Sequence, residues 1–335
     1  MRPSEEAKVL AGRAADFAQR VRDLRAALGK VVIGQDTLIF DLLVGVLAGG
    51  HVLLEGLPGL GKTRLAHALA AGLGFRFSRI QFTPDLMPAD VTGTRIVEQD
   101  ERGLSFRFQP GPLFANFVLA DEINRATPKT QSALLEAMQE GSVTVGDRTH
   151  ELPRPFTVVA TQNPIELEGT FPLPEAQLDR FLFKLDVPRP STPDLVRILS
   201  ATTGTEAAQI TAILGPAEVV ELHAIVRRIL CGESQLRFVA ELIRATEPGE
   251  ADASPTTRSM VRYGASPRAA QAIVLGAKVR ALLDARPVVE REDLVACALP
   301  ALRHRVQLSF EATAEEKRVE DLLPQWLETA RRRAT

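Results

Sequence analysis

The sequence has few residues that could hold a transition metal or form disulfide bonds. Its two cysteines, Cys231 and Cys297, have neither metal-site nor redox spacing. The five histidines are scattered, with no pair at metal-ligand spacing. This pattern argues against a resident transition metal and a disulfide framework. Together with the lack of an N-terminal signal peptide, it leads us to expect a cytoplasmic protein.

Long apolar runs and an excess of one charge are also missing. The longest apolar stretch, residues 38–48, is interrupted by Asp41 and is too short to span a bilayer. The formal net charge of −2 gives no basic footprint. We therefore expect neither a membrane nor a nucleic acid as a partner. A length of 335 residues favours two domains.

What the sequence does contain is a complete phosphate-binding pattern. Residues 56–63 read Gly-Leu-Pro-Gly-Leu-Gly-Lys-Thr, between an expected strand at 51–55 and an expected helix at 63–71. Glycines let the backbone wrap around a polyphosphate, so that N–H groups and the positive end of the helix face the anion. Lys62 would reach the β- and γ-phosphates, and the Thr63 hydroxyl would bind Mg²⁺. A glycine-rich turn without a ligand is the alternative. The residues expected to bind the nucleotide here are Gly56, Leu57, Pro58, Gly59, Leu60, Gly61, Lys62, Thr63 and Arg64.

Two carboxylates follow a second apolar strand, as in a Walker B element. The strand, 117–121, ends in Asp121 and is followed by Glu122. Asp121 would hold Mg²⁺, directly or through water, and Glu122 would act as the general base toward water. A solvated surface pair is the alternative. Asn163 follows a third apolar strand, 157–161, where it could orient water or touch the γ-phosphate, although an asparagine before a proline also suits an ordinary turn.

Strands and helices alternate over the first half of the chain. Continuous apolar runs separated by helical stretches predict an α/β fold, with a parallel sheet covered by helices and ligand loops at the carboxyl ends of the strands. The expected strands are 52–55, 75–81, 117–121, 157–161 and 181–187.

Beyond Pro188 the strand signal fades, and a second, all-helical domain is expected. Its helices are predicted at 217–230, 235–245, 267–283 and 291–303, and residues 247–265 are predicted to form a mobile loop. At the other end, an N-terminal helix with one apolar stripe is expected to pack on its own domain, with a seam to a neighbouring subunit as the alternative. The stripe consists of Leu10, Ala14, Phe17, Val21, Leu24 and Leu28.

The accumulated pattern resembles the AAA+ ATPases and, within them, the MoxR family. The resemblance covers residues 31–306. The stretches that carry it are 32–35 (Val-Ile-Gly-Gln), 56–63, 121–126 (Asp-Glu-Ile-Asn-Arg-Ala), 131–140, 160–164 (Ala-Thr-Gln-Asn-Pro), 173–181 (Leu-Pro-Glu-Ala-Gln-Leu-Asp-Arg-Phe) and 264–268 (Gly-Ala-Ser-Pro-Arg). It implies an ATP-driven hexameric ring, with nucleotide bound between neighbouring subunits and between an αβα domain and a helical lid.

The resemblance also assigns roles to residues and bounds to domains. Asn163 becomes the sensor-1 residue, Arg180 the arginine finger for the neighbour's ATP, and Arg268 the sensor-2 residue of the lid, while Gly34 and Gln35 lie near the adenine. The expected parts are the N-terminal helix (1–30), the AAA+ αβα domain (31–188) with a helix-2 insert (about 94–109) and a pre-sensor-1 hairpin (about 141–153), the lid (189–310) and a C-terminal tail (311–335).

Physical arguments bear on two of these roles. Ser266 is expected to cap a helix that begins at Pro267, which places the Arg268 cation where a helix dipole disfavours it by about 0.3–1 kcal/mol. A nearby phosphate would remove that conflict. For Arg180, an ordinary surface ion pair with Asp179 is the alternative. The tail, including Trp326, could dock on the lid or on a partner.

Two hairpins are predicted to interrupt the nucleotide fold. They are 95–108, about the turn 100–103, and 142–152, about Gly146 and Asp147. The resemblance places both at the central channel of the ring; decoration of the sheet is the alternative. Their arginines, at positions 95, 102, 107 and 148, are offset by acidic residues at 98, 100, 101, 147 and 151, which argues against a DNA-translocating ring.

The function expected from these patterns is Mg²⁺-dependent ATP hydrolysis by a ring that remodels, matures or activates a protein client. The resemblance adds a partner with a von Willebrand factor A domain. The alternatives are the motor subunit of a metal-chelatase-like complex and a nucleotide switch that does not hydrolyse. Glu122, Asn163 and Arg180 argue against the switch, because a pure binder needs neither a base nor a finger.

Overall fold

A five-stranded parallel sheet lies at the centre of the computed structural model, which describes residues 3–100, 103–164, 169–204 and 210–334. The strands occur in the order β2-β5-β8-β1-β9, and all four pairings are parallel. Each of the five expected strands is confirmed. Their bounds are β1 Val52–Glu55, β2 Phe77–Gln81, β5 Phe117–Asp121, β8 Thr157–Gln162 and β9 Phe183–Asp186.

Alternate residues of the strands point to two separate apolar layers. Phe117 and Leu119 of β5 belong to one buried cluster and Val118 to the other. The first cluster continues into the lid, where it includes Ile273 and Leu302. The nucleotide fold and the lid therefore share one hydrophobic core on this face of the sheet.

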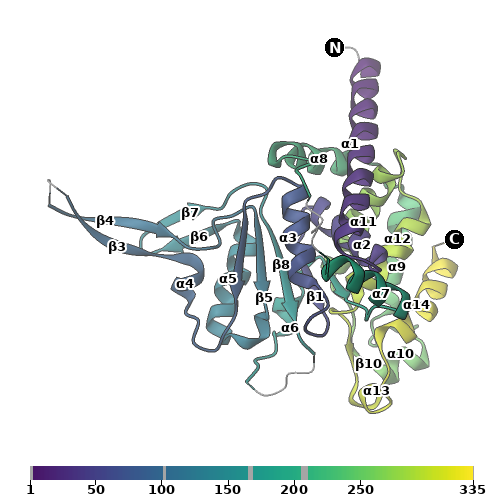
Figure 1. Cartoon of the computed structure of the whole chain (residues 1–335). Helices are drawn as coiled ribbons and strands as arrows, with labels where there is room; N and C mark the ends of the chain where they lie inside the picture. The colour runs from purple at the N-terminus through teal and green to yellow at the C-terminus, as the bar shows by residue number, and fades with distance from the viewer. Residues whose placement is uncertain (1–2, 101–102, 165–168, 205–209, 335) are drawn as a thin grey trace.

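Helices cover both faces of the sheet, and the lid helices gather on one side of the molecule (Figure 1). The helices that surround the sheet are α1 Pro3–Val31, α2 Asp36–Leu47, α3 Lys62–Gly72, α4 Pro88–Thr92, η1 Ile123–Arg125, α5 Pro128–Glu140 and α6 Glu175–Leu178. Those that follow the sheet are α7 Thr192–Thr202, α8 Pro216–Arg228, α9 Glu233–Ala245, α10 Pro255–Met260, α11 Pro267–Leu283, α12 Arg291–Leu302, α13 Phe310–Ala314 and α14 Val319–Arg333.

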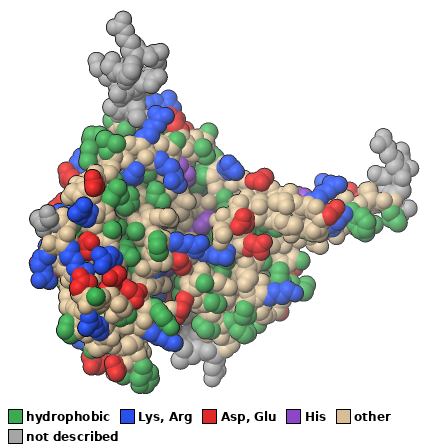
Figure 2. Space-filling view, turned by 180° about the vertical axis from the view of Figure 1, so that it is seen from behind, with side chains coloured by type: hydrophobic (Ala, Val, Ile, Leu, Met, Phe, Trp, Pro, Cys, Tyr) green, Lys and Arg blue, Asp and Glu red, His purple; other side chains and the backbone are tan. Residues whose placement is uncertain are grey.

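The two predicted hairpins are present and project from the sheet side away from the lid (Figure 1). They are β3 Gly93–Asp100 with β4 Gly103–Pro110, and β6 Ser142–Val145 with β7 Arg148–Glu151. The predicted turn residues 101 and 102 lie outside the described residues. Val97, Leu104 and Phe106 are 59%, 76% and 69% exposed, and Figure 2 shows apolar side chains near the end of this arm. The β3–β4 hairpin therefore exposes apolar side chains far from the hydrophobic core.

Helix α1 packs on its own chain, as expected for its apolar stripe. Phe17, Val21, Leu24 and Leu28 are buried, whereas the side chain of Leu10 lies outside the described part. The helix contacts α2 and α3 of the nucleotide fold and also α8 and α11. Its contacts thus extend beyond the predicted packing to the helices that follow the sheet.

The lid is helical, with two differences from expectation. The segment 247–265, predicted as a mobile loop, contains α10 and strand β10 (Val261–Tyr263). That strand pairs antiparallel with β11 (Gln307–Leu308), so the lid includes a small sheet. Composition alone suggested a loop because the segment is rich in small and polar residues, but Ser254 caps α10 by accepting the Thr257 N–H.

The C-terminal tail docks on the lid of its own chain. Trp326 of α14 is 1% exposed, and its indole Nε1 donates to Thr257 Oγ1 at 3.0 Å. The indole ring thereby joins α14 to α10. The sequence left open whether the tail docks on the lid or on a partner, and in this structure it docks on the lid.

Candidate active site

Three polar segments meet at the carboxyl edge of the sheet, because the strands that precede them are neighbours. β1 leads into the P-loop, β5 ends in Asp121, and β8 runs into Asn163. β8 lies between the other two. Parallel register thus brings together residues from three distant parts of the chain.

The P-loop forms an open cradle before helix α3. Gly59 and Gly61 both have φ of +80°, the left-handed region that glycine tolerates, and a Cβ at either would meet no described atom within 4 Å. No side chain caps α3 at Gly61. The first N–H groups of a helix need acceptors, and an anion supplies them together with charge that favours the dipole. The residues present therefore fit a bound phosphate.

Lys62 and Thr63 lie at the positions their predicted roles require. The Lys62 ammonium donates to the carbonyl oxygens of Gly56 and Leu57, the latter at 3.2 Å. Thr63 Oγ1 donates to Asp121 Oδ2 at 3.3 Å. A hydroxyl and a carboxylate side by side are the hard oxygen donors that Mg²⁺ uses together with phosphate oxygens. These side chains fit a magnesium ion bound with a nucleotide.

Asp121 is held by two residues that were not singled out from the sequence. It is 6% exposed. Thr161 Oγ1 donates to its Oδ1 at 2.7 Å, and the Arg79 guanidinium donates to its Oδ2 from Nε at 3.1 Å and from Nη2 at 2.7 Å. Arg79 sits on β2, whose residues pair in register with β5. The only signal in the sequence was a charged residue within a strand next to Walker B.

Glu122 has an unusual backbone conformation. Its φ of 57° and ψ of 50° lie in the left-handed region, which costs a non-glycine residue about 1–2 kcal/mol. Its N–H donates to Thr161 Oγ1 at 2.9 Å. Its carboxylate accepts from Gln81 Nε2 at 2.9 Å and Arg125 Nη1 at 3.0 Å. Strain of this kind is typical of functional positions, and here it accompanies contacts of the Glu122 carboxylate with Gln81 of β2 and Arg125 of η1.

The remaining residues expected at the nucleotide lie around the P-loop. Asn163 is 5% exposed. Gln35 Nε2 donates to Leu60 O at 3.2 Å, and its Oε1 is buried without a hydrogen-bond partner among the described residues. Gly34 directly precedes Gln35, and Arg64 is exposed in the first turn of α3. A cavity of about 550 Å³ adjoins this loop, and residues Gly56, Leu57, Leu60, Val306, Leu308 and Arg318 are part of its lining.

Arg180 and Arg268 lie at the opposite edge of the sheet. Leu182 N–H donates to His51 O, just before β1 begins, at 2.7 Å, whereas the P-loop follows the other end of β1. The four residues of β1 correspond to roughly 13 Å. Arg180 and Arg268 both line a cleft of about 280 Å³ at this edge. Neither guanidinium is therefore near the P-loop of its own chain.

The placement of Arg268 corrects one part of the sequence argument. Ser266 caps α11 and Pro267 is its first residue, as expected. The anion next to Arg268, however, is Asp179, whose Oδ2 lies 3.5 Å from Arg268 Nη1. A carboxylate of the same chain thus relieves the conflict with the helix dipole, for which a phosphate was expected. Sequence spacing could not reveal that α11 begins beside Asp179.

A further two observations limit the chemistry. Of the helices in the described part of the chain, none combines the length and apolarity that crossing a bilayer requires. In the same residues, no group of three or more histidine, cysteine or acidic side chains could hold a metal ion. Any magnesium at Thr63 and Asp121 would therefore complete its coordination with phosphate and water oxygens.

Comparisons with known proteins agree with this geometry. Residues 51–183 match the sequence model of the ATPase family associated with various cellular activities (AAA), and residues 255–326 match that of the AAA lid domain. The chain is 43% identical to "Chaperone MoxR1" of Mycobacterium tuberculosis over 95% of its own length and 84% of that protein. It is 33% identical to "Protein MoxR" of Paracoccus denitrificans, covering 94% and 96% of the two chains.

A solved structure extends the likeness to the whole fold. The crystal structure of a protein described as an ATPase, from Cytophaga hutchinsonii, superposes with a TM-score of 0.89 at 40% sequence identity. The match covers 97% of this chain and 98% of the other. The αβα sheet and the helical lid are therefore shared together with their relative arrangement.

Proposed function

Because the chain belongs to the MoxR family of AAA+ ATPases, we propose that it hydrolyses ATP with Mg²⁺ at the interfaces of a homo-oligomeric ring, a hexamer. The observation that supports this most directly is the separation of the two halves of the site. The P-loop and both Walker B carboxylates lie at one edge of the sheet, and Arg180 and Arg268 lie at the other. A head-to-tail contact between copies would bring opposite edges together.

Within one such interface, each residue has a distinct task. Lys62 and the P-loop N–H groups would bind the phosphates. Thr63 and Asp121 would hold Mg²⁺, which would neutralise charge on the phosphate oxygens. Glu122 accepts a proton from a water molecule oriented by Asn163, and the water oxygen bonds to the γ-phosphorus. The bond from that phosphorus to the β–γ bridging oxygen breaks, releasing ADP. Arg180 and Arg268 of the neighbouring copy stabilise the charge that develops.

Gln81 and Arg125 both donate hydrogen bonds to the Glu122 carboxylate in this structure. Both donate to the same oxygen, Oε2, so the attacking water would deliver its proton to Oε1.

The proposed client is a protein, remodelled in the cytoplasm with a partner that carries a von Willebrand factor A domain. The support for a client surface is the β3–β4 arm, where Val97, Leu104 and Phe106 are exposed. Apolar groups displayed on a projecting hairpin suit transient contact with other apolar surfaces. The Arg95 guanidinium lies over the Phe106 ring, with Cζ 5.0 Å from its centroid. This contact helps to hold the exposed ring in place on the hairpin.

The experiment that tests the hydrolytic proposal measures ATP turnover across protein concentration with Mg²⁺, while light scattering follows the mass. Wild type should show turnover per subunit that rises with assembly. Glu122→Gln should bind nucleotide and assemble equally well but lose about 10²- to 10⁴-fold in turnover. Nucleotide binding by assembled wild type without turnover would favour a switch, or a motor that is silent without its partner.

A further inference from the structure

The sequence Arg303-His304-Arg305 follows helix α12 of the lid, and Arg305 lines the same cleft as Arg180 and Arg268. All three side chains reach the segment 179–186, which contains β9 and the residues just before it. Arg303 Nη1 lies 3.0 Å from Asp186 Oδ2, and His304 Nε2 lies 3.0 Å from Phe181 O. Arg305 makes the most contacts of the three, at the end of the segment that carries Arg180.

Every N–H group of the Arg305 guanidinium has an acceptor. Nε donates to Asp179 Oδ1 at 2.6 Å. Nη1 donates to Leu182 O at 3.0 Å and Ala301 O at 2.7 Å. Nη2 donates to Asp179 O at 3.0 Å and Phe181 O at 2.6 Å. The five donors of one planar side chain thus join the end of α12 to the backbone on both sides of Arg180.

The burial of this side chain makes the arrangement rigid. The Arg305 side chain is 3% exposed, and a buried cation is tolerated only when it is paired and fully hydrogen-bonded. Lysine could keep the charge but has three donors on a point-like ammonium, so it cannot reproduce the fork. The position of the 179–182 backbone therefore depends on an arginine at 305.

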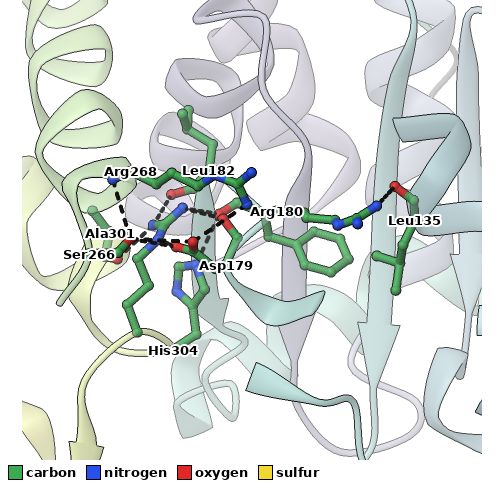
Figure 3. Close-up of polar contacts among 10 residues, drawn as sticks. Leu135, Asp179, Arg180, Leu182, Ser266, Arg268, Ala301 and His304 are labelled. Carbon is green, nitrogen blue, oxygen red and sulfur yellow. Dashed lines mark hydrogen bonds and ion pairs between the residues drawn. The ribbon is translucent and has the colours of Figure 1, made fainter. Parts of the chain in front are cut away.

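Asp179 and Arg180 point in opposite directions from this backbone (Figure 3). Asp179 faces the lid, where its carboxylate accepts from Arg305 and from Ser266 Oγ at 3.1 Å. Arg180 points away from the lid and donates from Nη1 to Leu135 O of α5. Arg268 touches the same Asp179 carboxylate at 3.5 Å. One carboxylate thus connects Arg305 with the segment of one proposed catalytic arginine and with the side chain of the other.

We infer that Arg305 is a positioning residue for the arginine finger: it fixes the segment 179–182 to the lid, so that Arg180 is presented to the neighbouring subunit. This inference rests on the proposed function. The five guanidinium donors of Arg305 are all used on protein acceptors, so we assign its effect to the position of Arg180. Because the anchor is a lid residue, a movement of the lid relative to the sheet would move the finger.

Arg305→Lys tests the inference in the full-length, assembled protein. The expected result is a kcat about 10²-fold lower, since misplacing a catalytic group by about 1 Å has that effect. KM for ATP and nucleotide binding should stay near wild type, because the P-loop of the same chain lies at the other edge of the sheet. Asp179→Asn, which keeps the shape of the side chain and removes its charge, should lower kcat in the same direction.

A double variant distinguishes positioning from general damage. If Arg305 acts through Arg180, then Arg180→Ala/Arg305→Lys should turn over ATP within about twofold of Arg180→Ala alone, because effects on one unit are not additive. Independent damage would make the two losses multiply. Arg286→Lys is the matched control: Arg286 also forks onto a carboxylate, Asp293 at 2.8 and 2.7 Å, but only within the lid. It should lower stability and leave kcat unchanged.

The outcomes separate this inference from the proposed function. An assembled, folded ring of Arg305→Lys or Asp179→Asn with kcat within about twofold of wild type, or multiplicative losses in the double variant, would overturn the role of Arg305. Both results would leave the ATPase proposal intact if wild type still turns over on assembly. Wild type without assembly-dependent turnover would instead refute the proposed function itself.

Discussion

Arg79 and Asp121 are joined across β2 and β5 by two hydrogen bonds to one carboxylate oxygen, Asp121 Oδ2, which also accepts from Thr63. A cation therefore already lies against the carboxylate proposed to hold Mg²⁺. A magnesium ion bound there would share this carboxylate with the Arg79 guanidinium or displace it.

Replacing Arg79 by glutamine should make Mg²⁺ easier to bind. The side chain of Arg79 is 49% exposed, and a half-exposed ion pair contributes about 0–1 kcal/mol, so the half-saturating Mg²⁺ concentration should fall by up to about fivefold. Titration of ATP turnover with Mg²⁺ measures this, with Arg79→Lys as the control that keeps the charge. An increase in the half-saturating concentration would mean that Arg79 helps to hold the nucleotide complex.

Mixed rings should reveal that the two arginines serve a neighbouring copy. Rings of Arg180→Ala alone should lose about 10³- to 10⁵-fold in turnover, as for loss of an arginine finger. Subunits with Glu122→Gln are also inactive, yet they carry an intact Arg180 and Arg268. When either arginine variant is mixed equally with Glu122→Gln, about a quarter of the interfaces should be complete.

Recovery of turnover on mixing is the measurement, made after the subunits have exchanged. For Arg268→Ala, failure to recover would show that this residue acts on the ATP of its own chain and that the lid moves a long way to reach it. For Arg180, an unmixed variant ring within tenfold of wild type would remove its role as a finger.

The contact between Leu24 of α1 and Gly72 of α3 should be sensitive to one methyl group. A Cβ at Gly72 would lie 2.2 Å from Leu24 Cδ1, so Gly72→Ala should cost about 1–3 kcal/mol of unfolding free energy by overpacking. Leu24→Ala should cost about 2–5 kcal/mol, because Leu24 is fully buried. The double variant should be more stable than the sum of the two losses predicts, since the new methyl fills the space that leucine leaves. Denaturant unfolding of all four proteins tests the coupling, and strict additivity would contradict the contact.

Burial of His51 should make stability depend on pH. Its pKa falls from 6.5 to about 4, because burial disfavours the charged ring. Val158 N–H donates to Nδ1 at 3.0 Å, so the neutral ring carries its proton on Nε2, which faces Met138 O at 3.0 Å. Between pH 6.5 and about 4 the unfolded chain binds a proton that the folded chain does not. Stability from this group is therefore complete above pH 6.5 and declines as the pH falls to about 4, by about 3 kcal/mol in total.

Replacing His51 by glutamine, which can also accept and donate a hydrogen bond, should remove this contribution. The unfolding free energy of wild type minus that of His51→Gln, measured from pH 7 to pH 4, should shrink as the pH is lowered. A constant difference over this range would mean that His51 does not titrate as its surroundings require.

The sheet and the nucleotide-binding edge could be predicted because both depend on local sequence patterns. Continuous apolar runs marked the strands, and the P-loop, Asp121 and Asn163 each follow one of them. What could not be predicted depends on how elements meet. Thr161, Arg79 and Gln81 reach the Walker B carboxylates only through the register of neighbouring strands, which no local pattern specifies.

The lid was harder to predict for the same reason. Four of its helices were expected, but the place where α11 begins relative to Asp179 depends on docking across the shared core. Arg305 was not singled out, because nothing near it in the sequence indicates that four of its five hydrogen bonds reach a segment more than a hundred residues away. The pair β10–β11 was missed because its two strands are short and distant in sequence.

Strand β9 is an outermost strand of the sheet. Within the described residues it pairs with one strand, β1. Helices α2 and α12 both contact it, so the lid covers a strand that would otherwise present backbone donors and acceptors to water. Such edges recruit strands from other molecules. We therefore expect a fragment cut near residue 188 to retain the P-loop, Asp121, Glu122 and Asn163 and yet to be prone to aggregate, because β9 would lose the cover of α12.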